Sequence, residues 1–289
     1  MNEQTLKTIL QDTYGDLTPH RLTGGYTNDT FLLKGSQSLL IAKVASSSND
    51  DIKNKMNCMR LLSETDIVPK AYDLIETDGA RVAVMEYKEG INGQSILDGK
   101  EGAKANELYK LLGRTLAKNI HSLRPDAVSA NGIHEYSIKN LNLDLDFVPE
   151  NLRIKTRDQL RRLNDHSQTW VLTHGDYGVH NVLYQDGQLA ILDWEWAEWG
   201  NPLTDIAWVL WFTNLHYPNQ ANQWLRLFLE EYRLHQRVEL KSDTLQSFGV
   251  YKVCKVLQRL AQAGQDVQKE WVRRLRWTLE TDIFDVYAD

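Results

Sequence analysis

Three polar residues in the second half of the chain have the types and spacing that phosphate chemistry requires. Asp176 and Asn181 are five residues apart, and Asp193 follows a pair of short strand-like runs within residues 182–192. A hairpin there would fold Asp193 back beside the other two. Phosphoryl transfer needs a carboxylate that orients and deprotonates the attacking hydroxyl, together with hard oxygen ligands for a magnesium ion. We therefore expect Asp176 to be the base, and Asn181 and Asp193 to hold the metal.

The segments around these residues resemble the aminoglycoside phosphotransferase and choline kinase family of small-molecule kinases. The segment from His174 through Asp176 to Asn181 is similar to the family's catalytic loop, and the segment from Asp193 to Asp205 is similar to its metal-site strand and following turn. The resemblance implies a bilobal α+β fold of the protein-kinase type, ATP and Mg²⁺ as cofactors, and transfer to the hydroxyl of a small molecule. It also implies that His174 and Asp205 support the loop structurally.

Three segments near the N-terminus match what the resemblance implies for nucleotide binding. The first contains Gly24, Gly25, Thr27 and Asn28. Its backbone amides could reach a β-phosphate, although a Gly-Gly pair alone is typical of a tight hairpin. The second is the apolar run 40–44 with its single cation, Lys43. On an inner strand Lys43 would pair with the α- and β-phosphates, whereas on an edge strand it would face water. The third resembles the hinge, where backbone groups of Glu86 and Tyr87 would contact adenine.

One position departs from the family pattern. The helix after the lysine strand usually carries a glutamate that holds the lysine, but Lys55 occupies the corresponding register in this chain. Either the alignment is shifted, another carboxylate substitutes, or Lys43 is held less firmly and turnover is lower.

An aromatic cluster flanks Asp193 and indicates where an acceptor could bind. Trp194, Glu195 and Trp196 follow it directly, and cations bind well on indole faces beside carboxylates. We expect Glu195 to contact a substrate amine, while Trp194 and Trp196 are as compatible with a core position as with a binding site. The acceptor class stays open between an aminoglycoside or other antibiotic, choline or ethanolamine, and another metabolite alcohol.

The elements that must position these residues divide the chain into two predicted lobes, 1–88 for the nucleotide and 89–289 for catalysis and the acceptor. The first opens with an amphipathic helix over 2–14 and continues as an antiparallel sheet between 21 and 87. A helix over about 51–62 interrupts that sheet. The second lobe is predicted to be mostly helical, with helices that include 102–122, 220–234 and 270–286, and short strands at 170–172, 182–184 and 189–192.

Composition limits the other functions open to this chain. Its 289 residues include 33 Lys plus Arg against 39 Asp plus Glu, a formal charge of −6, which argues against a general nucleic-acid binder. The longest apolar run, 206–212, is far too short for a membrane span, and the N-terminus lacks the pattern of a secretory signal. We expect a cytoplasmic protein with Cys58 and Cys254 as reduced, packed thiols. The sequence does not indicate an oligomeric state.

Two enzyme classes and one non-enzymatic class are the alternatives. A protein kinase would need an activation segment that ends in Ala-Pro-Glu, yet Asp193 to Asp205 spans 12 positions and that tripeptide is missing. A P-loop kinase would need a Gly-Lys-Ser/Thr motif, which the chain also lacks. A non-catalytic protein of the same fold that binds a nucleotide remains the alternative, and the retention of Lys43 with Asp176, Asn181 and Asp193 argues for catalysis.

Overall fold

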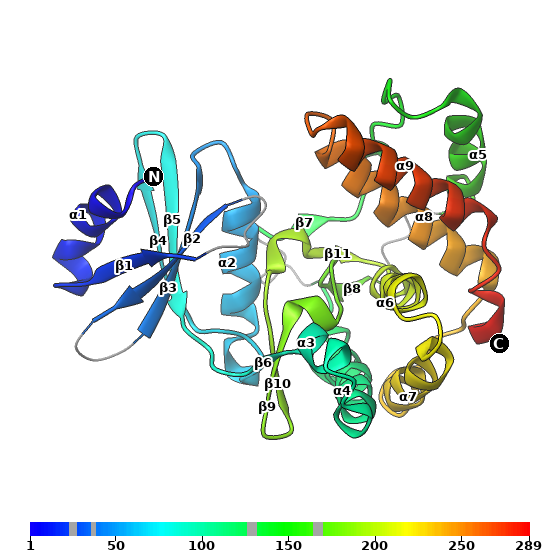
Figure 1. Ribbon diagram of the computed structural model, residues 1–289, viewed down its shortest axis with the longest axis horizontal. Helices are drawn as coiled ribbons and strands as arrows, with labels where there is room; N and C mark the ends of the chain where they lie inside the picture. The colour runs from blue at the N-terminus through cyan, green and yellow to red at the C-terminus, as the bar shows by residue number, and fades with distance from the viewer. Residues whose placement is uncertain (23–27, 36–38, 126–131, 164–169) are drawn as a thin grey trace.

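The N-terminal part of the chain is built around an antiparallel sheet. The computed structural model describes residues 1–22, 28–35, 39–125, 132–163 and 170–289. Within those ranges the sheet has five strands in the order β1-β2-β3-β5-β4 (Figure 1). They are β1 (Thr18–Arg21), β2 (Asp29–Lys34), β3 (Leu39–Ser46), β4 (Ala71–Thr77) and β5 (Ala80–Glu86). The predicted Asp-Gly hairpin joins β4 to β5, with Thr77 opposite Ala80.

Strand β1 begins before residue 21, where the sequence analysis placed the start of the sheet. Its four residues include Pro19, which lacks an amide hydrogen and is tolerated at the edge of a sheet. Among the residues that the structure describes, β1 pairs with β2 alone, so Pro19 lies on an edge strand as this rule requires. The short length and the proline hid the strand from a pattern of alternating apolar residues.

Two helices cover opposite faces of this sheet (Figure 1). Helix α1 (Glu3–Tyr14) packs Leu6 and Leu10 against Ala42 and Val44 of β3 in one apolar cluster. Helix α2 (Asp51–Leu61) packs on the other face, in the cluster that continues into the rest of the molecule. Because side chains alternate along a strand, Lys43 points to the α2 face. β3 lies between β2 and β5, so Lys43 is on an inner strand.

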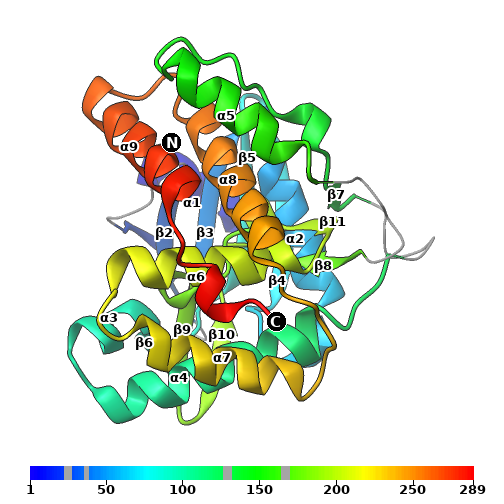
Figure 2. The ribbon, with the colours of Figure 1, turned by 90° about the vertical axis from the view of Figure 1, so that its right-hand side faces the viewer.

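The C-terminal part is mostly helical, and two small sheets carry its loops. Helices α3 (Gly93–Asp98), α4 (Gly102–Thr115), α5 (Glu150–Leu160), α6 (Leu203–His216), α7 (Ala221–Arg233), α8 (Ser242–Arg259) and α9 (Gln265–Glu280) surround them (Figure 2). In the described ranges one small sheet has the order β10-β9-β6 and the other β7-β11-β8. Their strands are β6 (Ile91–Asn92), β7 (His134–Glu135), β8 (Val171–Thr173), β9 (Val182–Gln185), β10 (Gln188–Ile191) and β11 (Glu198–Gly200). An antiparallel sheet followed by a mostly helical part is the α+β architecture that the sequence analysis expected.

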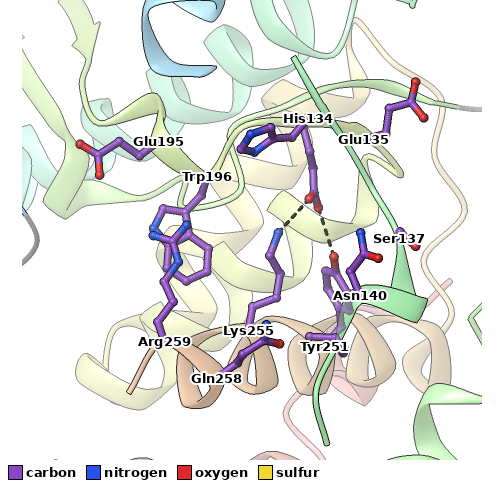
Figure 3. A pocket seen from close by; sticks show the side chains of 12 residues that line it. His134, Glu135, Ser137, Asn140, Glu195, Trp196, Tyr251, Lys255, Gln258 and Arg259 are labelled. Atoms are coloured by element: carbon purple, nitrogen blue, oxygen red, sulfur yellow. Dashed lines mark hydrogen bonds and ion pairs between the residues drawn. The ribbon is translucent and has the colours of Figure 1, made fainter. Parts of the chain in front are cut away.

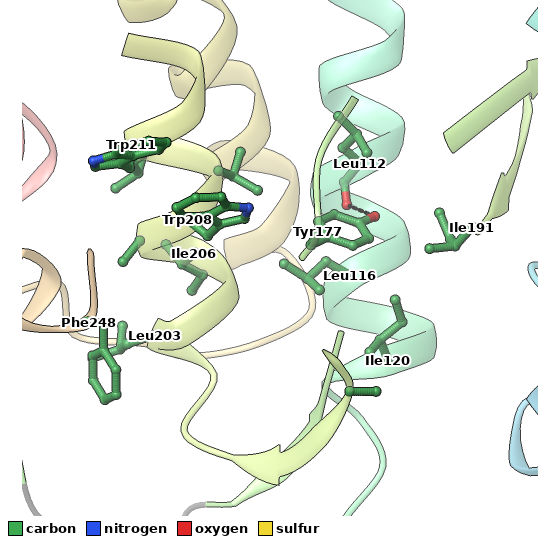
Figure 4. Close-up of a cluster of buried hydrophobic side chains, with 14 of the residues drawn as sticks. Leu112, Leu116, Ile120, Tyr177, Ile191, Leu203, Ile206, Trp208, Trp211 and Phe248 are labelled. Atoms are coloured by element: carbon green, nitrogen blue, oxygen red, sulfur yellow. Dashed lines mark hydrogen bonds between the residues drawn. The ribbon is translucent and has the colours of Figure 1, made fainter. Parts of the chain in front are cut away.

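Helices α4 and α6 frame the core beneath the loop that carries Asp176 (Figure 4). Leu112 and Leu116 from the α4 side and Ile206 from α6 are fully buried. The hydroxyl of Tyr177, in the loop itself, donates to the Leu112 carbonyl at 3.0 Å, which ties the loop to α4. Among the described helices none is both long and apolar enough to cross a membrane.

The helix predicted over 102–122 changes its pitch before it ends. α4 stops at Thr115, and Leu116–Ile120 form a π-turn in which the His121 amide donates to the Leu116 carbonyl at 2.8 Å. A π-turn accommodates one more residue than an α-helical turn and often lies at a functional site. The predicted 270–286 helix also differs, because α9 spans Gln265–Glu280 and Thr281 is extended.

Candidate active site

Asp176 lies in the loop after β8 and is held by hydrogen bonds from two side chains. Asn181 Nδ2 donates to its Oδ2 at 2.9 Å, and the indole nitrogen of Trp208 in α6 donates to its Oδ1 at 2.9 Å. Asn181 Nδ2 also donates to the Asp176 carbonyl at 2.9 Å, which closes the loop on itself. Gly175 has a φ of +75°, and a Cβ there would lie 2.2 Å from the Trp196 carbonyl oxygen. The loop can therefore make this turn only with glycine at 175.

Asp205, at the start of α6, anchors the same loop from below. Its two carboxylate oxygens accept the backbone amides of His174 at 2.7 Å and Gly175 at 2.8 Å. Its Oδ2 also lies 3.2 Å from His121 Nε2, and His121 Nδ1 lies 2.8 Å from the Tyr232 hydroxyl. Burial alone would raise the pKa of Asp205, but its bonds to His121 and to the loop hold that pKa below its usual range. These contacts are those of a carboxylate that holds a loop.

His174 bridges the catalytic loop and the segment that leads to Asp193. Its Nδ1 accepts the Asp176 amide at 3.1 Å, so Nε2 carries the proton and donates to the Leu192 carbonyl at 2.8 Å. Burial lowers the pKa of His174, which keeps this neutral tautomer. The ring therefore fixes the spacing between two functional segments.

Asp193 and Lys43 form the centre of a charged cluster between the sheet and the C-terminal part. Lys43 Nζ lies 2.5 Å from Asp193 Oδ1 and 3.2 Å from Glu195 Oε1. Lys55 Nζ, on α2, lies 3.4 Å from the same Asp193 oxygen. Asn28 Nδ2 donates to Glu195 Oε1 at 3.0 Å. Two lysines and two carboxylates are thus brought together from α2, β3 and the turn after β10.

The charges of this cluster change the acidity of its members. Burial and the neighbouring Lys43 lower the pKa of Lys55 to about 8. Burial opposes the charged form of Lys43 as well, but Asp193 and Glu195 outweigh it and raise the pKa of Lys43 above its usual value. Burial would raise the pKa of Asp193, yet Lys55 and Lys43 hold it well below the ordinary range. Lys43 and Asp193 therefore both carry their charges at neutral pH.

A second lysine that the sequence analysis did not select stands beside Asp176. Lys252 of α8 is 1% exposed, and its Nζ lies 3.7 Å from Asp176 Oδ1. Burial lowers the pKa of Lys252 to about 7. Burial would raise the pKa of Asp176, but Lys252, His180 and His174 hold it well below its usual range. Asp176 is consequently a carboxylate at any pH near neutrality.

A cavity of about 360 Å³ opens beside the Lys43 cluster, and its walls include Lys43, Lys55, Asn181, Asp193 and Trp194 together with apolar side chains such as Ile41 and Met85. Glu86 and Tyr87 also line it. Their backbone amides donate to the carbonyls of Lys70 at 2.9 Å and Leu39 at 3.4 Å, so these two amides already serve the sheet. The apolar wall and the charged end suit a flat ring joined to phosphates.

A further cavity, of about 410 Å³, lies on the other side of the turn that contains Glu195 (Figure 3). Its walls come from β7, the segment after β7, β11 and one face of α8. They include Trp196, Glu198, Tyr251, Lys255 and Arg259. The sequence analysis identified Trp196 but missed the α8 residues, although Lys252, Lys255 and Arg259 have the spacing of one helix face.

The structure brings some of the site residues predicted from the sequence together and places others in the core. Asp176, Asn181, Asp193 and Lys43 converge, whereas Gly24, Gly25 and Thr27 lie outside the described residues. Trp194 is fully buried, and its Nε1 donates to the Ile191 carbonyl at 3.0 Å. Glu195, expected to contact a substrate amine, is 3% exposed with its Oε1 beside Lys43 and Asn28.

The model of the phosphotransferase enzyme family matches residues 18–240 of the chain, a span that includes every element of the site except α8. The chain belongs to this family. This match agrees with the family that the resemblance of the catalytic loop implied.

Solved structures of small-molecule kinases share the fold over nearly the whole of both chains. Amicoumacin kinase hAmiN, in complex with AMP-PNP, Ca²⁺ and Ami, has a TM-score of 0.73 at 16% identity and covers 97% of this chain and 94% of its own. Spectinomycin phosphotransferase APH(9)-Ia, in complex with ADP and spectinomycin, has a TM-score of 0.70 at 14% identity, with 99% and 97% covered. A microcompartment-associated aminopropanol kinase has a TM-score of 0.71 at 13% identity, with 96% and 95% covered. At such identities the likeness shows the fold.

Curated relatives are longer proteins that contain a similar segment. Acyl-CoA dehydrogenase family member 10 of Mus musculus is 25% identical over 215 residues, which are 64% of this chain and 19% of that protein. Acyl-CoA dehydrogenase family member 11 of Rattus norvegicus is 28% identical over 214 residues, 66% of this chain and 27% of that protein. The chain therefore spans about a quarter or less of the length of these relatives.

Proposed function

We propose that this protein transfers the γ-phosphoryl group of ATP to a hydroxyl group of a small molecule. The observation that carries the proposal is that Lys43, Asn181 and Asp193 line the 360 Å³ cavity, while the Asp176 carboxylate is hydrogen-bonded to Asn181. This set combines a carboxylate for the acceptor with hard oxygen atoms and a cation for the phosphates.

The nucleotide would lie between the two predicted lobes, 1–88 and 89–289. Its base would occupy the apolar wall near Ile41 and Met85, and its phosphates would reach Lys43. The loop with Gly24, Gly25, Thr27 and Asn28 is proposed to cover those phosphates. The amicoumacin kinase and spectinomycin phosphotransferase structures are complexes with AMP-PNP and ADP, which supports nucleotide binding by this chain as well.

Asn181 and Asp193 fit a magnesium ion. The amide nitrogen of Asn181 donates to Asp176, so the oxygen is the atom of this side chain that can bind a cation. The Asp193 side chain is 39% exposed and lines the same cavity, and carboxylate and amide oxygens are ligands that Mg²⁺ accepts. When bound, the ion would neutralise phosphate charge.

Asp176 would orient the acceptor. In the proposed reaction the acceptor oxygen forms a bond to the γ-phosphorus while the bond from that phosphorus to the bridging oxygen of ADP breaks. The hydroxyl proton passes to an Asp176 oxygen as the new bond forms. Because Lys252 and its neighbours hold the pKa of Asp176 low, the carboxylate is a weak base and acts mainly by fixing the hydroxyl in line.

Glu195 is proposed to position Lys43. Its carboxylate bonds to Lys43 and to Asn28, next to the expected phosphate loop, and it is 3% exposed. A carboxylate in this place supplies the partner that the α2 position, occupied by Lys55, cannot supply.

The test is ADP release with Mg-ATP across hydroxyl-bearing acceptors that include sugars, aminoglycosides, amino alcohols and hydroxy acids, with Asp176→Ala as the blank. The matched control is Asp158→Ala, on the exposed face of α5. Turnover that Asp176→Ala abolishes and Asp158→Ala keeps would support the proposal. A rise in the melting temperature with Mg-ATP, together with no turnover of any acceptor, would favour a non-catalytic nucleotide-binding protein. If Mg-ATP does not bind and no acceptor is turned over, the proposal is overturned.

A further inference from the structure

The 360 Å³ cavity has a second lysine at its charged end. Lys55 of α2 lines this cavity together with Lys43 of β3. The Nζ of Lys43 lies 2.5 Å, and the Nζ of Lys55 lies 3.4 Å, from one and the same atom, Asp193 Oδ1. Because both ammonium groups adjoin one oxygen atom, a phosphate group that reaches Lys43 also comes within reach of Lys55.

The ammonium group of Lys55 has more hydrogen-bond donors than the surrounding protein uses. A lysine carries three N–H donors. Among the residues that the structure describes, Asp193 Oδ1 is the one acceptor given to Lys55, and at 3.4 Å this is a long hydrogen bond. The Lys55 side chain is 4% exposed, so bulk water has little access to the other donors. A buried ammonium with so few partners is costly, and an anion in the cavity would supply the acceptors that it lacks.

The carboxylate that Lys55 contacts is also the proposed metal ligand. Magnesium on Asp193 would therefore compete with the two lysines for that carboxylate. Lys43 has a second acidic partner, since Glu195 Oε1 lies 3.2 Å from its Nζ. Lys55 has no second carboxylate partner in the described part of the chain. In the loaded site Lys55 is thus the cation that needs a new partner, and the phosphates of the nucleotide are the anions that the proposed function brings there.

The helix that carries Lys55 is fixed against the C-terminal part of the chain. Asn54, the residue before it, is 1% exposed and bonds on both sides of its amide group. Its Nδ2 donates to the Ala197 carbonyl at 2.7 Å, and its Oδ1 accepts the His134 amide at 2.9 Å. These hydrogen bonds hold α2 against the turn that follows Asp193. Lys55 is therefore kept beside the cavity, and a ligand does not have to draw the helix inward first.

The balance of charges explains why a lysine suits this position of α2. Lys43 and Lys55 face Asp193 and Glu195, so two cations balance two carboxylates. A glutamate in place of Lys55 would leave one cation against three carboxylates, and their combined charge would repel the phosphates of a nucleotide. Because Glu195 already pairs with Lys43, the site does not need a carboxylate from α2 as well.

We propose that Lys55 binds a phosphate group of the nucleotide directly, as a second phosphate-binding lysine beside Lys43. The inference rests on the proposed kinase function and adds a nucleotide-binding residue to it. The phosphates would be held by cations from two elements, β3 and α2. Glu195 would position Lys43 without a partner on the helix.

Binding of ATP and of adenosine separates a phosphate contact from other roles of Lys55, because adenosine has no phosphate groups. Each ligand is titrated by calorimetry into the wild-type protein and into Lys55→Gln, first with EDTA and then with Mg²⁺. We expect Lys55→Gln to weaken ATP binding about tenfold or more in both conditions, and adenosine binding by less than about twofold. Lys53→Gln is the matched control, because Lys53 lies on the same helix with a side chain that is 41% exposed. It should bind both ligands as the wild type does.

Binding in EDTA decides between a direct contact and an effect through the metal ligand. If Lys55→Gln keeps the wild-type affinity for ATP in EDTA and loses affinity only with Mg²⁺, Lys55 acts through Asp193 and the inference is overturned. A wild-type protein that binds ATP no more tightly than adenosine in EDTA also overturns it. If the wild type binds neither ligand in either condition, the proposed kinase function fails, so the two failures are distinguishable.

A series of charges at the same position makes the result independent of any one variant. Lys55→Met is the second neutral variant in case Lys55→Gln folds poorly, since methionine suits a buried position. Lys55→Arg keeps the positive charge and should bind ATP in EDTA within about threefold of the wild type. Lys55→Glu restores the acidic residue that the family usually has, and it should bind ATP in EDTA more weakly than the neutral variants do. Tighter binding by Lys55→Glu than by the neutral variants would overturn the inference.

Discussion

The carboxylate of Glu195 lies 3.2 Å from the ammonium of Lys43, across 152 positions of sequence. Lys55, which occupies the register where the family usually has a glutamate, instead pairs with Asp193 at 3.4 Å. The α2 position therefore carries a cation, and the acidic partners of Lys43 come from the turn after β10. Lys43 keeps a buried acidic partner, but that partner comes from the segment that also carries the proposed metal ligand.

Glu195→Gln should lower kcat about 10- to 100-fold with little change in stability. The amide keeps the shape but loses the charge that holds Lys43, so the lysine is no longer fixed against the phosphates. Steady-state kinetics with saturating ATP measures the change. Glu135→Gln, an exposed glutamate on β7, is the control and should remain near wild-type. Equal kcat for the two variants would contradict a positioning role for Glu195.

Asp205→Asn should destabilise the protein by about 2–4 kcal/mol, because the buried carboxylate accepts two backbone amides and contacts His121. An amide group in its place presents one donor to groups that are themselves donors. Urea unfolding followed by tryptophan fluorescence gives the free energy. Asp266→Asn, at a fully exposed position on α9, should change it by less than about 0.5 kcal/mol. A loss below about 1 kcal/mol for Asp205→Asn would argue against its loop-holding role.

Lys252 should make stability rise with pH above neutrality. Burial lowers its pKa to about 7 in the folded protein, whereas the usual value of a lysine is 10.5, so the unfolded chain binds more protons between these two pH values. Methionine does not titrate, so the unfolding free energy of the wild type minus that of Lys252→Met should increase by up to about 1.4 kcal/mol per pH unit between pH 7 and 10. Urea titrations at several pH values measure it. A constant difference would show that the lysine titrates normally.

Gly113→Ala should destabilise the packing of α4 on α7. A Cβ at this position would lie 2.1 Å from the Phe228 carbonyl oxygen, so the two helices must separate. We expect a loss of about 2–3 kcal/mol in thermal or urea unfolding. Gly102→Ala, at the open start of the same helix, meets nothing within 4 Å and should be neutral or slightly stabilising. Similar results for both variants would contradict the close approach.

Sequence patterns were sufficient where local rules determine the structure. Alternating apolar residues and an Asp-Gly turn located β2 to β5. The spacing of Asp176, Asn181 and Asp193 around a hairpin predicted that these residues come together, as the structure shows. The same patterns missed elements whose structure depends on contacts between distant parts of the chain. β1 is an edge strand with a proline, and α8 was not separated from the other C-terminal helices.

The contacts of α8 and of Glu195 were the least predictable. In sequence Lys252, Lys255 and Arg259 look like an ordinary basic helix face. The contacts of Lys252 and Arg259 with the Trp196 ring, which comes from a different element, are seen only in the structure. Likewise Glu195 beside Trp194 and Trp196 indicated an amine site, whereas its bond to Lys43 is a tertiary contact that spacing cannot reveal. The role proposed for Glu195 remains a prediction.

The π-turn after α4 has a consequence for how this part of the chain can vary. One residue corresponds to about 100° of rotation in a helix, so removal of a single residue from Leu116–Ile120 would restore a regular α-helix and turn His121 away from Asp205 and Tyr232. The length of this segment is therefore as constrained as the identity of its residues. A chain of this kind can exchange side chains within the turn, but an insertion or a deletion there would break the contact of His121 with Asp205, the carboxylate that holds the loop of Asp176.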